Sequence, residues 1–310
     1  MPVRLPKVAV LLAAYNGIKW IEEQLSSILE QSGVEVSVYI SVDPSADDTE
    51  AWCNAYAAKT DHVVVLPFAG SFGGASRNFF RLMRDVDISA FDFTAFADQD
   101  DVWHSDKLER AISEIERQQV DAYSSNVIAF WPDGKSCVLD KSQPQVEWDY
   151  LFEAAGPGCT YVFRENLARS LKDSMLENWS SLQQVSLHDW FCYAFARSHG
   201  YRWYIDPIPS MRYRQHENNQ VGANTGLSSL VSRYKTIHDG WWFSQVQLIA
   251  RLVGRDSDYF VKGWVPLRQG DLIKLSFSAW QCRRRLRDKI LFFFICWATA
   301  LIGKKTNDGA

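Results

Sequence analysis

The stretch KVAVLLAAY (residues 7–15) is a nearly unbroken run of aliphatic residues. A strand of a parallel sheet has this composition when helices cover both of its faces. Three further apolar runs follow at residues 34–43, 62–68 and 91–98, and segments with helical spacing of apolar residues separate them. Strands that alternate with helices in this way predict an α/β fold with a mostly parallel central sheet.

The pattern changes after residue 120. Residues 122–139 predict a hairpin around Asp133-Gly134, residues 186–200 predict a helix ended by Gly200, and residues 201–216 predict extended structure. From about residue 226 the chain has the pattern of amphipathic helices, without a clear strand. We therefore predict a main α/β domain over residues 1–225 and a helical extension over residues 226–310.

Composition narrows the class of protein. The 310 residues carry a formal charge of −4, which gives no reason to expect nucleic acid as a partner. The six cysteines show no CxxC spacing, which argues against a zinc ribbon or a disulfide scaffold and fits a reducing compartment. No segment reaches the roughly 20 apolar residues that a spanning helix needs, and the N-terminus does not have the pattern of a signal peptide. We expect a cytoplasmic protein.

Polar residues follow four of the predicted strands. Tyr15 follows the first strand and Asp43 ends the second, while a glycine-rich loop at residues 67–78 with Arg77 follows the third. In open parallel sheets, ligands bind beyond these carboxyl ends. The chain has neither GxGxxG after the first strand nor GxxxxGK[ST], so a dinucleotide-binding Rossmann domain and a P-loop are disfavoured.

The fourth strand ends in FADQDDVW (residues 96–103), with three carboxylates within four residues. Residues two apart in extended structure project the same way, so Asp98 and Asp100 can converge on one cation. Magnesium takes few protein oxygens and completes its shell with water and phosphate. A solvated acidic turn is the alternative that this spacing leaves open.

Five segments in order resemble the inverting GT-A glycosyltransferases of family 2. They are VAVLLAAYNG, VDPSADDT, FADQDDVWHSDKL, LHDW and YRQHENNQVG, which span about residues 8–222. The combination of DQDDVW, HDW and YRQHxNN is similar to the rhamnosyltransferase-like branch, which builds bacterial surface polysaccharides. The resemblance implies a GT-A fold, a nucleotide-sugar donor, and Mg²⁺ or Mn²⁺ as cofactor.

The resemblance also implies roles for single residues. Asp100 matches the metal-coordinating carboxylate, Asp98 matches its partner near the ribose or the metal, and His216 matches the histidine that completes the metal site. Asp189 matches the general base that takes a proton from the acceptor hydroxyl. As an alternative, Asp189 could simply be an acidic residue in the first turn of a helix.

Further positions are expected to line the two substrates. We expect Ala13, Tyr15, Asp43, Arg77 and Asp98 on the nucleotide side, where Arg77 can meet a phosphate. The resemblance places Asp43 at the base and Tyr15 stacked near it. Val42 and Pro44 depart from the family pattern of two acids followed by Gly-Ser. On the acceptor side we expect Trp190 as a platform for a sugar face, together with Trp103 and His188.

The C-terminal region combines a basic cluster (residues 283–289) with an apolar stretch (residues 290–303). Basic residues beside an apolar, aromatic surface favour a helix that lies on an anionic membrane. A helical subdomain packed on the catalytic domain, or a homodimer, is the equally weighted alternative. Membrane contact would place the protein at the inner face of the bacterial cell membrane.

The sequence therefore predicts an inverting, metal-dependent hexosyltransferase. The expected donor is dTDP-rhamnose and the expected acceptor is a saccharide or a lipid-linked saccharide of an O-antigen or capsule. The alternatives are a glucosyl- or galactosyltransferase that uses a UDP-sugar, a catalytically inactive nucleotide-sugar or glycan-binding protein, and a metal-dependent phosphohydrolase of nucleotide sugars.

Overall fold

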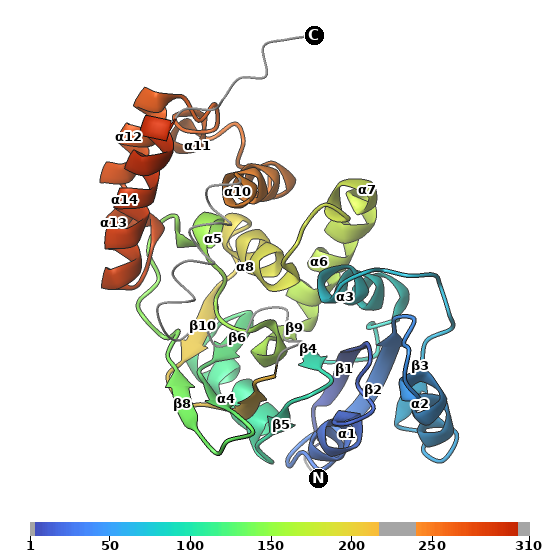
Figure 1. The fold of residues 1–310 in the computed structure, drawn as a ribbon. Coiled ribbons are helices and arrows are strands. Elements are labelled where there is room, and N and C mark those ends of the chain that lie inside the picture. Colours follow the sequence, from blue (N-terminus) through green and yellow to red (C-terminus); the bar gives the residue numbers. More distant parts are fainter. Residues whose placement is uncertain (1–3, 217–239, 303–310) are drawn as a thin grey trace. The chain divides into compact units, whose positions relative to one another are not determined.

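The computed structural model describes residues 4–216 and 240–302 (Figure 1). The chain divides into two compact units, one of residues 1–142 and 155–223 and the other of residues 143–154 and 224–310. The predicted domain boundary at residues 225/226 lies outside the described residues. The short segment at residues 143–154, which the sequence did not set apart from its neighbours, belongs with the C-terminal helices.

A seven-stranded sheet forms the centre of the first unit, in the order β10-β6-β9-β4-β1-β2-β3. Its strands are β1 (Lys7–Ala14), β2 (Glu35–Val42), β3 (Val63–Val65), β4 (Phe93–Asp98), β6 (Ala122–Ser125), β9 (Val162–Arg164) and β10 (Trp203–Asp206). Neighbouring strands are parallel except around β9, which runs antiparallel to β4 and β6. The predicted mostly parallel α/β sheet is confirmed.

The register of the sheet brings the predicted strand ends to one edge. Ala14 pairs with Val42 across β1 and β2, and Ala13 pairs with Asp98 across β1 and β4. The residues that directly follow β1 and β2, Tyr15 and Asp43, therefore emerge beside the acidic end of β4. This is the ligand-binding edge of an open parallel sheet.

Helices cover both faces of this sheet. One face packs against α1 (Ile21–Leu29), α2 (Thr49–Ala57) and α4 (Lys107–Gln118). The opposite face packs against α3 (Ala75–Asp85), α6 (Glu165–Glu177) and α8 (His188–Ser198), and α7 (Trp179–Leu182) follows α6. All of β1 from Val8 to Ala14 is buried, as expected for a strand that is covered on both sides.

Aromatic rings fill much of the second face. Phe79 of α3 lies 5.0 Å from Phe96 of β4, and Phe96 lies 5.2 Å from Phe163 of β9, measured between ring centroids. Phe80 contacts Phe191 of α8 edge-on at 5.8 Å. Part of the aromatic content of the chain is thus accounted for by the core.

A second, smaller sheet lies in the same unit, in the order β5-β11-β7-β8. Its strands are β5 (Val102–Trp103), β7 (Val127–Phe130), β8 (Ser136–Leu139) and β11 (Met211–Arg214). The antiparallel pairing of β7 and β8 confirms the predicted hairpin around Asp133-Gly134. Because β5 directly follows the acidic end of β4, its pairing with β11 brings residues after 210 to that end.

The described part of the second unit is helical, as predicted for the C-terminal region. Its helices are α5 (Asp149–Phe152), α10 (Trp241–Leu252), α11 (Tyr259–Lys262), α12 (Gln269–Phe277), α13 (Ala279–Cys282) and α14 (Leu286–Ile302). Buried Arg284 donates to Asp149 at 3.0 Å, which ties the start of α14 to α5 within this unit. None of the helices in the described ranges is long and apolar enough to cross a membrane.

Candidate active site

A glutamine side chain joins the loops that follow β1 and β4. The Tyr15 N–H donates to Gln99 Oε1 at 2.7 Å, and Gln99 Nε2 donates to the Tyr15 carbonyl at 2.7 Å. Gly17 makes room for this contact, because a Cβ there would lie 2.0 Å from Gln99 Oε1. The Tyr15 side chain remains 56% exposed, so its ring is available for stacking, while Ala13 is buried in β1.

Asp43, at the end of β2, holds the glycine-rich loop. Its two carboxylate oxygens accept the N–H groups of Phe72, at 2.7 Å, and Gly73, at 2.9 Å. Gly73 has a positive φ of 66°, a conformation that favours glycine. In this structure Asp43 therefore organises the loop, and its predicted contact with a nucleotide base stays a prediction.

Arg77 is exposed at the start of α3, but part of its guanidinium is engaged. Its Nε donates to the Gln183 carbonyl at 2.9 Å, and Nη1 donates to the Phe72 carbonyl at 3.3 Å. These bonds orient the side chain beside the glycine-rich loop. A phosphate contact by Arg77 stays a prediction.

Asp100 and His216 meet at the end of β4, although 116 residues separate them in the sequence. His216 Nε2 lies 2.6 Å from Asp100 Oδ2, and the imidazole stacks on Trp20 with 4.2 Å between ring centroids. Of the three metal ligands that the resemblance implied, these two are adjacent.

Arg214 brings the end of β11 to this turn. Its backbone N–H donates to Asp101 Oδ1 at 3.1 Å, and its Nε donates to the Asp100 carbonyl at 2.8 Å. The guanidinium also pairs with Glu23 of α1. Asp101 therefore helps to place His216, two residues after Arg214.

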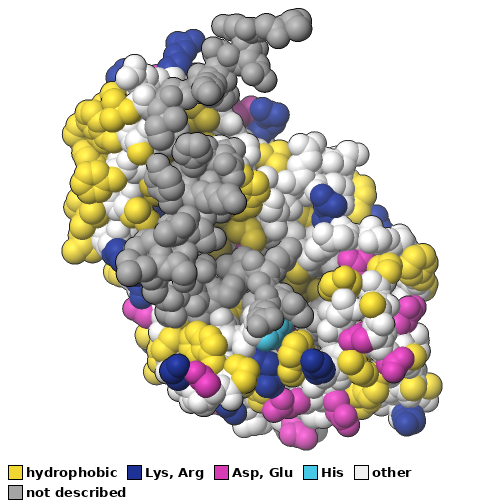
Figure 2. All heavy atoms as spheres, viewed as in Figure 1, with side chains coloured by type: hydrophobic (Ala, Val, Ile, Leu, Met, Phe, Trp, Pro, Cys, Tyr) yellow, Lys and Arg dark blue, Asp and Glu magenta, His cyan; other side chains and the backbone are white. Residues whose placement is uncertain are grey.

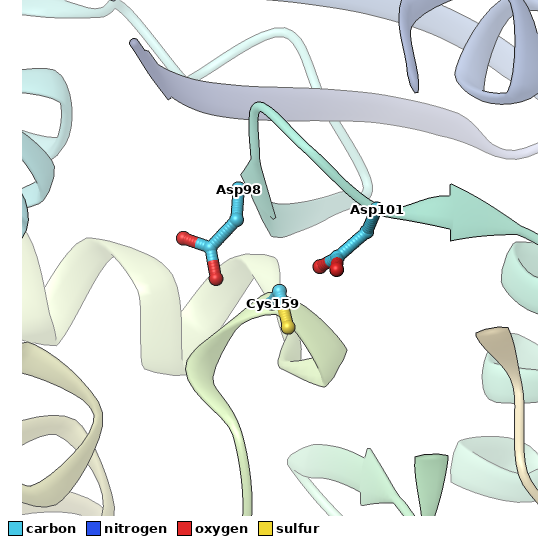
Figure 3. Close-up of side chains that lie close together, drawn as sticks. All are labelled: Asp98, Asp101 and Cys159. Carbon is cyan, nitrogen blue, oxygen red and sulfur yellow. The ribbon is translucent and has the colours of Figure 1, made fainter. Parts of the chain in front are cut away.

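A compact group of ionisable side chains lies at the end of β4. One ligand atom each of Asp98, Asp101 and Cys159 falls within 4.8 Å of the other two, and Figure 3 shows both carboxylates directed toward the thiol. Burial, and then the charge of Asp100, raises the pKa of Asp98 and of Asp101 well above the usual range. Burial and both of these carboxylates also raise the pKa of the Cys159 thiol, so it stays protonated, which supports a packing role.

Lys107 is the basic residue that lies next to the group of Asp98, Asp101 and Cys159. Its side chain is fully buried, its Nζ lies 3.7 Å above the ring centroid of Trp103, and burial lowers its pKa to about 7. Neither Lys107 Nζ nor Asp101 Oδ2 has a hydrogen-bond partner among the described residues. The charge of Asp101 opposes the lowering of the Lys107 pKa by burial.

The residues at the end of β4 fit a divalent cation. Asp100 supplies a hard oxygen and His216 a nitrogen 2.6 Å away, and Asp98 lies close enough for the charge of Asp100 to raise its pKa. Carboxylate oxygens suit Mg²⁺ and Mn²⁺. A cation here would also offset the repulsion among the acids.

Asp189 lies in the first turn of α8, with Oδ1 accepting the Trp190 N–H at 2.7 Å. Burial raises its pKa to about 6, although that N–H and the charge of Lys141 act in the opposite direction. The charge of Asp189 in turn raises the pKa of Asp98, so these two carboxyl groups are electrostatic neighbours. A carboxylate with a pKa near neutrality is suited to accept a proton.

The neighbouring 3₁₀ turn, η1 (Gly158–Thr160), leaves space for this part of α8. A Cβ on Gly158 would lie 2.5 Å from His188 Nε2 and 3.1 Å from Asp189 Cβ. His188 stacks on Phe79 at 4.0 Å between ring centroids, and burial lowers its pKa to about 3, so it is neutral. Gly158 is therefore important because it has no side chain, and no sequence pattern indicated this.

The three residues predicted for the acceptor side lie inward in this structure. Trp103 is 4% exposed, Trp190 is 3% exposed, and His188 packs between aromatic rings. Their placement gives them packing roles, and contact with a sugar stays a prediction for each. Several residues of the site were not predicted from the sequence: Trp20, Gln99, Lys107, Gly158 and Arg214.

Comparisons with known proteins identify the family of the chain. The model of a family described as "Glycosyltransferase like family 2" matches residues 6–137. The dTDP-rhamnosyl transferase RfbG of Shigella flexneri is 44% identical over 283 residues, which cover 90% of this chain and 96% of that protein. The amylovoran biosynthesis glycosyltransferase AmsB of Erwinia amylovora is 33% identical over 112 residues, or 35% of this chain and 36% of that one.

Among solved structures, the fold is similar to that of residues 1–349 of TarS from S. aureus in complex with UDP-GlcNAc. The TM-score is 0.55 and the identity 15%, and the match covers 96% of this chain and 92% of that one. At this identity the likeness concerns the fold alone.

Proposed function

This chain belongs to glycosyltransferase family 2, and we propose that it transfers L-rhamnose from dTDP-rhamnose to a saccharide acceptor of a surface polysaccharide. The observation that carries the proposal is the grouping of Asp98, Asp100 and His216 at one strand end, with Asp189 as an electrostatic neighbour. The name of the Shigella relative, a dTDP-rhamnosyl transferase, supports the choice of donor.

The reaction that we propose is a direct displacement with inversion at the anomeric carbon. The acceptor oxygen attacks that carbon while the bond to the dTDP oxygen breaks, and Asp189 accepts the proton of the acceptor hydroxyl. A carboxylate whose pKa is about 6 is ionised at neutral pH yet basic enough for this transfer. Asp189 then returns the proton to solvent.

Asp100, His216 and Asp98 are the residues that we propose to hold Mg²⁺ or Mn²⁺. The cation would neutralise the diphosphate of the donor and of the departing nucleotide. On the nucleotide side, the exposed Tyr15 ring would stack near the base, and the loop held by Asp43 would lie beside it. Arg77 is the basic residue of that loop and would face the phosphates.

The donor can be tested without knowing the acceptor. Isothermal titration calorimetry with Mn²⁺ should give the tightest binding for dTDP-rhamnose among dTDP-, UDP- and GDP-sugars. A UDP-sugar that binds more tightly would contradict the proposed donor while leaving the transferase assignment intact. Loss of donor binding when Mn²⁺ is replaced by EDTA would support the proposed cation site.

Sugar transfer requires an acceptor, and the products of the reaction distinguish a transferase from a hydrolase and from a binding protein. With polysaccharide repeat fragments as acceptors, mass spectrometry should show addition of one deoxyhexose, and NMR should show an anomeric configuration opposite to that of the donor. Release of dTDP at the same rate with and without acceptor would instead indicate a hydrolase. Donor binding without turnover on any fragment would indicate a binding protein.

A further inference from the structure

The described helices of the second unit leave an apolar face exposed. The face comprises side chains between 45% and 70% exposed, namely Phe277, Trp280, Leu286, Ile290, Phe294 and Leu301. Figure 2 shows hydrophobic side chains gathered over the region of α12 to α14. Large exposed side chains grouped in this way mark an interaction site more often than isolated ones do.

Helical geometry explains why α14 has two apolar stripes. Leu286, Ile290 and Phe294 follow one another at intervals of four residues, so they lie on one side of the helix. Phe292 and Cys296 lie on another side and are buried within the unit. The buried stripe packs within the unit, whereas most of the surface of the other stripe is exposed.

Phe277 and Trp280 extend the face beyond α14. Phe277 at the end of α12 contacts Phe293 edge-on at 5.8 Å, and Phe293 contacts Phe294 at 5.5 Å, so the rings form one continuous patch. Lys289 Nζ lies 6.0 Å from the centroid of the exposed Trp280 ring. Aromatic rings beside basic side chains are typical of helices at a lipid interface.

Positive charge borders this patch, although the whole chain carries a formal charge of −4. Between residues 268 and 302 the sequence has seven basic residues and two acidic ones. Two of the seven, Arg283 and Arg284, form ion pairs within the unit with Glu153 and Asp149. Arg287 has a 64% exposed side chain, and Lys274 is also exposed. One of the two acids, Asp288, is largely buried and lies near Arg283 and Arg287.

We propose that this apolar face, together with its basic border, binds the surface of an anionic lipid membrane. The exposed rings and aliphatic side chains would enter the headgroup region, and Lys274, Arg287 and Lys289 would contact lipid phosphates. Because no described helix can span a bilayer, α14 would lie along the surface. This inference does not depend on the donor or the acceptor proposed above.

A second copy of the chain fits the face less well than lipid does. In a two-fold dimer the same patch meets itself, so the basic borders of the two copies would approach each other. Like charges in such a contact are unfavourable. Anionic lipid instead offers the opposite charge along the whole border.

Flotation of the full-length protein with vesicles tests the proposal. We expect binding to phosphatidylcholine vesicles that contain about 30% phosphatidylglycerol, a level that gives a strongly negative surface, and little binding to phosphatidylcholine alone. The double variant Ile290→Ser/Phe294→Ser should lose about tenfold or more of the binding. Both side chains are exposed, so its melting temperature should stay near that of the wild type.

Matched variants test each part of the surface. Tyr259→Ser replaces a 94% exposed aromatic residue outside the face and should leave flotation unchanged. Arg287→Glu/Lys289→Glu should remove the preference for anionic vesicles, whereas Lys135→Glu, in the other unit, should not. Flotation is measured without sugar transfer, so its failure and a failure of the proposed function are distinguishable.

Three outcomes would overturn the proposal. The wild type fails to float with anionic vesicles, or Ile290→Ser/Phe294→Ser floats as well as the wild type. In the third, the wild type does not bind vesicles, light scattering shows that it is a dimer, and the double variant is a monomer. That result would assign the face to a second copy of the chain.

Discussion

The ends of β2 and β4 both present aspartates at the same edge of one sheet. They differ in how fully the protein itself supplies partners for the carboxylates. Asp43, after β2, has both carboxylate oxygens bonded to backbone N–H groups of the glycine-rich loop. At the end of β4, burial and then the charges of neighbouring acids raise the pKa of Asp98 and Asp101. The carboxylate after β2 is satisfied by backbone groups of the protein, whereas the acids after β4 would gain from the cation proposed above. The same residue type at equivalent positions can thus build a scaffold or a binding site.

The largest effect is expected for Asp189→Asn, which removes the proposed base beside the β4 end. Transfer should fall by about 10²–10⁴-fold, while donor affinity stays close to that of the wild type. In the wild type, kcat/KM should rise with pH through about 6, because Asp189 must be ionised to accept a proton. Full activity of the variant, or a flat pH profile, would rule out Asp189 as the base.

The same variant has an expected signature in stability. The pKa of Asp189 is raised in the folded protein, so the folded state binds more protons and loses stability as pH rises from about 4 to 6. Asn does not titrate and avoids this loss. Thermal unfolding should therefore show Asp189→Asn gaining about 1–3 kcal/mol over the wild type across that pH range.

Asp100→Ala and Asp43→Ala test the contrast between the two strand ends directly. Asp100→Ala should weaken Mn²⁺-dependent donor binding by about 10–100-fold, the range typical of perturbed metal sites. Asp43→Ala should loosen the glycine-rich loop yet keep its response to Mn²⁺. Calorimetry with and without Mn²⁺ measures both. An unchanged Mn²⁺ response in Asp100→Ala would remove the distinction between the two ends.

A smaller effect is expected at Asp101, which accepts the Arg214 N–H. Asp101→Ala leaves this donor without its partner and should cost about 1–3 kcal/mol in thermal unfolding. Asp101→Asn keeps an acceptor oxygen and should cost less than about 1 kcal/mol. Because this bond helps to place His216, the Ala variant should also bind Mn²⁺ more weakly. An equal loss of Mn²⁺ binding in both variants would argue against that role.

The smallest effect on donor binding is expected for Gln99→Ala, which separates the loops after β1 and β4. Two hydrogen bonds at a partly exposed site contribute about 0.5–1.5 kcal/mol each. Donor affinity should fall a few-fold while kcat is kept, since Gln99 positions Tyr15 and does not contact the reacting atoms. A loss of kcat without a change in KM would place Gln99 in the chemistry instead.

The strand ends could be predicted from the sequence because hydrophobic periodicity is a local signal. The run before Tyr15, the run before Asp43 and the run before Asp98 each stand out without tertiary context. Parallel pairing then brings their ends together. The approach of His216 to Asp100 came only through the family resemblance, since no local pattern joins residues 116 positions apart.

The other parts of the fold and of the candidate site depend on tertiary packing, which a pattern along the sequence does not contain. The strands β5 and β9 have two and three residues, too few for a period to be read. Space at Gly158 matters only because α8 starts against it. Trp103 and Trp190 show that burial of an aromatic residue near a predicted site cannot be predicted from the sequence pattern, because the pattern is the same for a buried and an exposed ring.

The antiparallel insertion of β9 between β4 and β6 sets an order of assembly during synthesis. Strands β1 to β4 can pair as soon as residues up to 98 have emerged, but the far edge of β4 has no partner until residues 162–164 follow. His216 reaches Asp100 later still. Contacts so distant along the chain form slowly. A nascent chain would therefore pair β1, β2 and β4 first and bring His216 to Asp100 last, so products truncated before residue 216 should not hold the proposed cation.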